Sequence, residues 1–90
     1  MRRLVSLLGP EARRGLLKFF VNRGVKLAMI AKLSNVSDST LRNFIYGRRH
    51  SIRDDIFLSI LTKIIELFPH ETKNFLEKIS SEIRELAEEI

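Results

Sequence analysis

The chain has 90 residues, of which 44% are hydrophobic and 30% charged, and it contains no cysteine. This length suits a single domain, and the composition is that of a packed protein rather than of a disordered or low-complexity one. Disulfides, zinc-thiolate sites and cysteine nucleophiles are excluded. A membrane span requires about 18 consecutive apolar residues, and no apolar run in this chain is that long. We therefore expect a soluble protein, located in the cytoplasm.

Apolar side chains recur at helical spacing along most of the chain, and no segment shows the alternation typical of a strand. Residues 1–9 are expected to form a flexible arm. The first helix begins at Pro10, which a first helical turn tolerates, and ends at Gly24. A short second helix covers residues 27–33 and ends at Asn35, because asparagine tolerates the left-handed conformation that terminates a helix.

Two further helices follow in the middle of the chain. Ser37 offers an N-terminal cap for a third helix, which stops at Gly47. Ser51 is expected to cap a fourth helix that runs to about residue 68. Nine of the thirteen residues from Ile56 to Phe68 are apolar, more than one core-facing stripe uses. The fourth helix is therefore expected to be central or buried on two sides.

A fifth helix is predicted over about residues 71–89. Its apolar residues recur at alternating steps of three and four, the spacing of a helix–helix seam. They are Leu76, Ile79, Ile83, Leu86 and Ile90. Two heptads are too few for a free coiled coil, so the seam either closes the core of this chain or forms a homodimer interface, and the two alternatives carry equal weight.

The predicted fold is a compact all-α bundle of about five helices. It forms one domain, residues 1–90, with residues 10–68 as its core and residues 70–90 as a C-terminal helix.

The net charge of +5 is unevenly distributed along the chain. Residues 1–53 carry 12 basic and two acidic side chains, a net charge of +10, whereas residues 54–90 carry four basic and nine acidic ones, a net charge of −5. Such a block of positive charge attracts polyanions, and an anionic membrane surface competes with nucleic acid as the partner. A solvated surface without a partner would intersperse the two signs. We therefore favour a polyanionic partner, with nucleic acid as the first candidate.

No pattern in the sequence is typical of a catalytic or metal site. His50 and His70 lack the spacing of a ligand pair, and the chain has no glycine-rich phosphate loop. The carboxylates of the C-terminal part are spaced like the outer face of amphipathic helices. We therefore expect that the protein is not an enzyme and that it binds no cofactor, metal ion or small-molecule ligand.

Residues 30–47 read IAKLSNVSDSTLRNFIYG and resemble the helix-turn-helix of the lambda repressor and Cro-like family. Ala31 is small enough for two helices to cross closely, and Asn35 stands at the turn position where the family usually has glycine. Leu41 and Phe44 would turn inward. Only seven residues separate the third and fourth helices, too few for a two-stranded wing, so the resemblance implies a non-winged form.

The resemblance further implies that the third helix, about residues 37–46, lies in the major groove of double-stranded DNA. Arg42 would bond guanine, Asn43 adenine and Asp38 cytosine, because these side chains match the donors and acceptors of those bases. The expected base-contacting residues are Asp38, Ser39, Arg42, Asn43 and Tyr46. The expected backbone-contacting residues are Lys26, Lys32, Ser37, Arg48 and Arg49.

The sequence thus favours a sequence-specific regulator of transcription that binds double-stranded DNA as a homodimer on a palindromic site. Two alternatives stay open: an adaptor that binds a protein partner through the apolar C-terminal helix, and a binder of structured RNA. Arg42 and Asn43 on an exposed helix face are also compatible with plain solvation. Arg2 and Arg3 either reach DNA from the arm or are solvated, and a solvated terminus is the more common arrangement.

Overall fold

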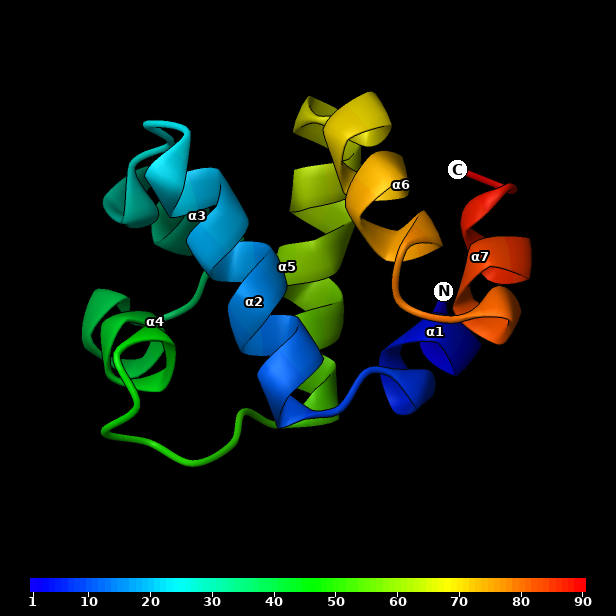
Figure 1. Ribbon diagram of the computed structural model, residues 1–90. Helices are drawn as coiled ribbons and strands as arrows, with labels where there is room; N and C mark the ends of the chain where they lie inside the picture. Colours follow the sequence, from blue (N-terminus) through cyan, green and yellow to red (C-terminus); the bar gives the residue numbers. More distant parts are fainter.

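The computed structural model describes all 90 residues and contains seven α-helices and no strand (Figure 1). The helices are α1 Arg2–Leu7, α2 Pro10–Asn22, α3 Leu27–Leu33, α4 Asp38–Ile45, α5 Asp54–Leu67, α6 Pro69–Glu77 and α7 Ser81–Ala87. The molecule measures 33 × 23 × 21 Å, and none of its helices is long and apolar enough to cross a membrane. The all-helical prediction is confirmed, whereas the number of helices is seven rather than five.

α5 is the central helix of the molecule. In Figure 1, α2 lies in front of it, α3 and α4 form one end of the molecule, and α1, α6 and α7 form the other. Phe57, Ile60, Leu61 and Ile64 of α5 are buried, and the helix packs against α1, α3 and α6. These contacts on several sides account for the excess of apolar residues in this segment, and the predicted central position is confirmed.

The N-terminal segment contains a helix rather than the expected flexible arm. Leu4 and Val5 of α1, and Leu8 directly after it, are buried in the core. α1 packs against α5 and α7, and Arg3 forms an exposed ion pair with Glu82 of α7 at 3.5 Å. The expectation of an arm was wrong because a helix this short is marginal by itself and gains its stability from tertiary burial.

The predicted fifth helix is divided into α6 and α7. Ser80, between them, has an extended backbone (φ −160°, ψ 164°), and its Oγ accepts a hydrogen bond from the N–H of Ile83 at 3.2 Å. The serine side chain thus caps α7. α6 and α7 pack on each other, so the spacing of buried residues continues across the break and hides the boundary from an analysis of periodicity.

The start of α5 also differs from the prediction. Ser51 does not cap this helix; the N-cap is Arg53, and no side chain makes a capping hydrogen bond. Asp54 is bound by the guanidinium of Arg13 at 2.8 Å, and Asp55 by that of Arg53 at 3.0 Å. The hydrogen bond from Arg53 holds the pKa of Asp55 below its ordinary value. Two carboxylates therefore stand at the positive end of the helix dipole, which favours their charge.

Candidate nucleic-acid interface

A four-residue turn joins α3 to α4. Asn35 adopts the left-handed conformation, with a φ of 56°, as predicted for the residue that ends this helix. The N–H of Val36 donates to the carbonyl of Ala31 at 2.9 Å, and Ala31 is buried. Ser59 of α5 donates to the carbonyl of Ser34 at 2.8 Å. The turn is thus bonded both to α3 and to the central helix.

α4 begins at a serine cap and buries one face. The Oγ of Ser37 accepts a hydrogen bond from the N–H of Thr40 at 3.4 Å. Leu41, Phe44 and Ile45 are fully buried. The predicted cap and the inward orientation of Leu41 and Phe44 are confirmed. Because these side chains anchor α4 in the core, the residues on its opposite side point outward.

The outer side of α4 carries the five predicted base-contacting residues, which we call the α4 face: Asp38, Ser39, Arg42, Asn43 and Tyr46. All are exposed except Asn43, which is half-buried, and Tyr46 is 58% exposed. Arg42 donates to Oδ2 of Asp38 at 3.1 Å, with about half of each side chain exposed. An exposed pair of this kind stabilises a helix by only about 0.3–0.5 kcal/mol, so Arg42 can exchange Asp38 for another partner at little cost.

Basic side chains precede and follow the α4 face along the chain. Lys26 and Lys32 lie at the start and near the end of α3, and Arg48 and Arg49 lie in the loop of residues 46–53. We call these four exposed side chains the basic rim. None of them takes part in the five ion pairs of the molecule, so no carboxylate compensates their charges directly.

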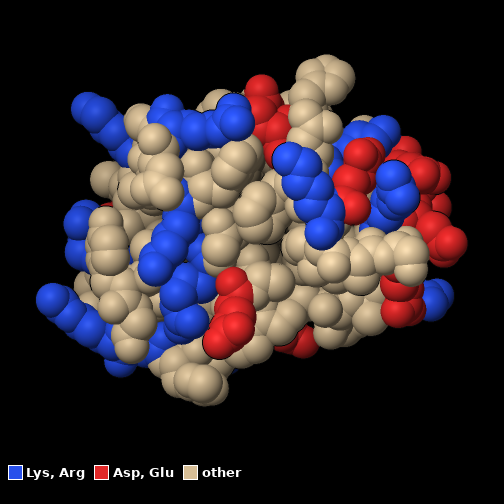
Figure 2. Space-filling model, viewed as in Figure 1, with Lys and Arg blue, Asp and Glu red and all other residues tan.

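Charge is segregated in space as well as along the chain. Figure 2 shows Lys and Arg spread over the end of the molecule formed by α3 and α4. Most Asp and Glu side chains in this view gather at the opposite end, over α6 and α7, with a few basic side chains among them. The end that carries the α4 face therefore has the positive potential that attracts polyanions.

Two basic residues of the first half of the chain do not belong to this surface. Arg13 is only 6% exposed, and its guanidinium binds three backbone carbonyls as well as Asp54. Arg14 is half-buried and donates to three carbonyls near the C-terminal end of α4. Sequence reasoning counted both as surface charge. The signal it missed is that Arg13 lies three and four residues before two buried leucines, on the apolar side of α2.

The five residues of the predicted seam do not form one exposed stripe. Leu76 and Ile83 are buried, Leu86 and Ile90 are half-buried, and Ile79 is 38% exposed. Since α6 packs against α7, Leu76 and Ile83 close the core of this chain and are not free to contact a second copy. For these two residues the structure supports the internal alternative.

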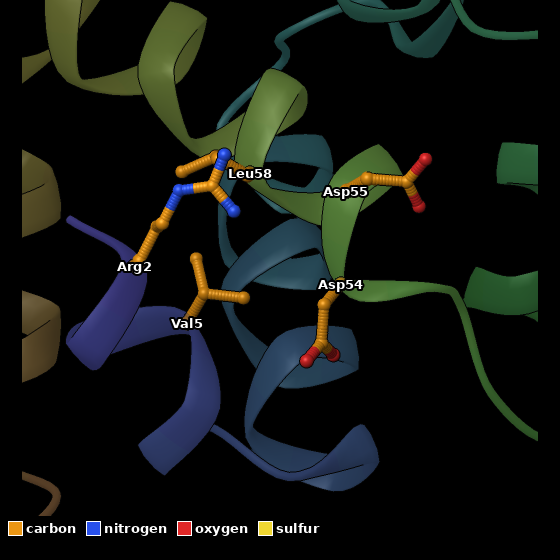
Figure 3. Close-up of a pocket in the computed structure, with 5 residues that line it drawn as sticks. All are labelled: Arg2, Val5, Asp54, Asp55 and Leu58. Atoms are coloured by element: carbon orange, nitrogen blue, oxygen red, sulfur yellow. The ribbon is translucent and has the colours of Figure 1, made fainter.

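A hollow of about 240 Å³ lies between α1 and the start of α5 (Figure 3). It is lined by Arg2, Val5, Asp54, Asp55 and Leu58. Both carboxylates are already bound by arginines, and Asp55 points away from the hollow. No group of three or more His, Asp or Glu side chains lies together as metal ligands would. The polar groups of the hollow do not converge on one point, unlike those of a typical binding pocket.

The α4 face and the basic rim form the best-developed candidate site of the chain. They combine exposed polar side chains, uncompensated positive charge and a support that is buried and hydrogen-bonded. No protein-family model, no curated protein and no solved structure matches this chain.

Proposed function

We propose that the protein is a regulator of transcription that binds double-stranded DNA sequence-specifically, with α4 as the recognition helix of a non-winged helix-turn-helix. The observation that carries the proposal is the α4 face, which is polar and outward-facing and is backed by three fully buried side chains. An α-helix fits into the major groove of DNA, which is about 12 Å wide. The buried side of α4 holds the polar side in one orientation relative to the bases.

The α4 face offers a different chemistry to each base. Arg42 is the proposed reader of guanine, because a guanidinium donates two bonds to O6 and N7. Asn43 suits adenine, which presents one acceptor and one donor. Asp38 repels phosphate and suits only a donor such as the amino group of cytosine. The hydroxyls of Ser39 and Tyr46 can donate or accept a hydrogen bond, so they suit a donor or an acceptor on a base.

The basic rim is the proposed contact with the phosphate backbone. Its members on α3 and in the 46–53 loop lie before and after the recognition helix, so they suit the two backbones that border one groove. Ser37 adds a polar contact at the start of α4. Four neutralised phosphates per copy would make the logarithm of the affinity fall with the logarithm of salt concentration with a slope of about 3 to 4.

The proposed functional unit is a homodimer on a palindromic site, because a single recognition helix reads only a few base pairs. Half-sites on one side of the duplex lie about 34 Å apart. The longest dimension of the molecule is 33 Å and the others are shorter, so two copies fit on neighbouring half-sites without overlap.

The test is a selection of bound sequences from random duplex DNA, followed by affinity measurements on the enriched sequence over a range of salt concentrations. We expect enrichment of a palindrome whose half-sites are about one helical turn apart, and a salt slope of about 7 for the dimer, twice the value per copy. Absence of any enriched sequence, or an affinity that does not respond to salt, would contradict the proposal. Tighter binding of a structured RNA of equal length would assign the surface to RNA instead.

A further inference from the structure

Arg14 bridges α2, the end of α4 and the following loop. Its Nε donates to the carbonyl of Phe44 at 2.8 Å, and one terminal nitrogen donates to the carbonyls of Arg49 and His50, both at 3.2 Å. The guanidinium also lies 4.7 Å from the centre of the Phe44 ring. A single side chain of α2 thus binds the end of α4 and the following loop, 30 to 36 positions further along the chain.

The 46–53 loop is bonded at both of its ends. The N–H of Arg49 donates to the carbonyl of Asn43 at 3.0 Å, which folds the loop back on α4. Arg13, next to Arg14 on α2, donates to the carbonyl of Ile52 at 2.9 Å near the other end of the loop. Adjacent arginines of one helix therefore hold the loop that carries half of the basic rim.

The loop also orients one of its own basic side chains. The Nε of Arg49 donates to the carbonyl of Ser51 at 3.1 Å, which leaves its terminal nitrogens free. Arg48 makes no side-chain hydrogen bond or ion pair and is exposed. Both guanidinium groups are thus available to an anion, on a loop whose backbone is held from α2.

We propose that Arg14 is a positioning residue for DNA binding. It holds the 46–53 loop against the end of α4, so that Arg48 and Arg49 stand beside the α4 face before DNA arrives. Prior ordering of the loop removes an entropic cost that binding would otherwise carry. Arg14 itself is not assigned to phosphate, because its donors are directed at backbone carbonyls. The inference rests on the function proposed above.

The chemistry of this position requires arginine rather than any cation. A guanidinium is a planar fork that donates to several carbonyls and stacks on an aromatic ring, whereas a lysine ammonium is a compact point charge on a flexible stem. The substitution Arg14→Lys therefore keeps the charge and removes the fork. Lys18→Gln is the matched control, because Lys18 lies one turn further along α2, is exposed and takes part in no ion pair.

The first measurement is amide hydrogen exchange without DNA, read by NMR on Gly47 and Arg49, whose N–H groups bond back to α4. We expect Arg14→Lys to speed exchange at these amides by about tenfold or more, while the protected amides of α6 keep their rates. Unchanged exchange in the loop would overturn the inference. Should Arg14→Lys not fold, Arg14→Gln, which keeps one donor group, is measured in the same way.

The second measurement is the affinity for the selected duplex. We expect Arg14→Lys to weaken binding about tenfold and to lower the salt slope by about two per bound copy, although no charge is lost. Lys18→Gln should change affinity by less than about threefold. In a background that carries both Arg48→Gln and Arg49→Gln, Arg14→Lys should have no further effect. Wild-type affinity in Arg14→Lys, or an equal loss in both backgrounds, would overturn the inference. If the wild-type chain binds no duplex, the proposed function fails, and hydrogen exchange still decides whether Arg14 holds the loop.

Discussion

The charged side chain of Arg13 is buried and binds groups of the protein itself. It is 6% exposed, lies 4.9 Å from the centre of the Phe57 ring and donates to the carbonyls of Leu8, Val5 and Ile52 at 2.7 to 2.9 Å. These bonds join α1, α2 and the segment before α5. A guanidinium has five N–H donors in a fixed geometry, which suits such a junction of several chain segments.

Arg13→Met should therefore lower the free energy of unfolding by about 3–5 kcal/mol, because it leaves the carbonyls of the buried residues Leu8 and Ile52 without a donor. Urea denaturation measures the loss. Asp54→Asn is the control: it removes the charge at the other end of the same ion pair, but the Asp54 side chain is 72% exposed, so we expect about 1 kcal/mol or less. Equal losses in the two variants would show that the ion pair, not the carbonyl bonds, carries the stability.

Arg42 is the residue on which the proposed specificity depends most. Arg42→Ala should cost about 1–3 kcal/mol of binding free energy on the selected duplex and relax discrimination at one base pair. Competition between the selected duplex and its single-base variants measures both effects. Lys32→Ala, on the basic rim, should instead weaken all duplexes alike. A sequence-selective loss in Lys32→Ala would contradict the division between the α4 face and the basic rim.

At the scale of the elements, the turn between α3 and α4 depends on one unusual backbone conformation. Asn35 is the only residue other than glycine with a positive φ. Asn35→Ala should lower the free energy of unfolding by about 1 kcal/mol. Alanine lacks the short polar side chain that lets asparagine adopt the left-handed conformation at lower cost. Thermal or urea unfolding measures the change. Asn74→Ala, on an exposed site within α6, should be neutral within about 0.5 kcal/mol.

The division between α6 and α7 illustrates a limit of helical periodicity. Apolar residues at alternating steps of three and four indicate which side of a helix faces the core. The same spacing occurs in one long helix and in two shorter helices that pack on each other. The boundary is instead set by Ser80, whose hydroxyl competes for a backbone N–H. Two consecutive serines at 80 and 81 were the local signal for this break, and the capping geometry identifies the first as the cap.

At the scale of the whole molecule, the C-terminal helices complete the core of a single chain. Ile83→Ala should lower the free energy of unfolding by about 2–5 kcal/mol, as expected for a buried aliphatic side chain, and Ile79→Ala, at 38% exposure, by about 1 kcal/mol or less. Urea unfolding at protein concentrations about 100-fold apart supplies the check. A loss at Ile83 that depends on concentration would show that this residue lies between two copies rather than in one core.

The whole molecule is also electrically polarised. The basic rim lies at the end formed by α3 and α4, and most of the acidic side chains in Figure 2 lie at the end formed by α6 and α7. In the proposed complex, this arrangement orients the molecule as it approaches a duplex, with the α4 face forward. Salt at physiological concentration screens the attraction between the protein and the duplex beyond about 8 to 10 Å. The charge separation therefore affects the rate of encounter more than the final contacts.

The sequence by itself determined the features that depend on neighbours a few positions away. The helical class, the ends at Gly24 and Gly47, the left-handed Asn35 and the Ser37 cap follow from backbone sterics and local hydrogen bonds, and the structure has them where the sequence predicts them. The excess of apolar residues likewise indicated the central position of α5.

Only the tertiary structure decided which charges face water and which short segments are helical. The place of Arg13 on the apolar side of α2 indicates its burial but not its partners: the carbonyls that Arg13 and Arg14 bind at Ile52 and His50 lie 39 and 36 positions away. α1 is helical because α5 and α7 cover its apolar side. Local sequence patterns do not indicate which distant residues will be in contact, because contacts between distant segments form only when the whole chain has folded.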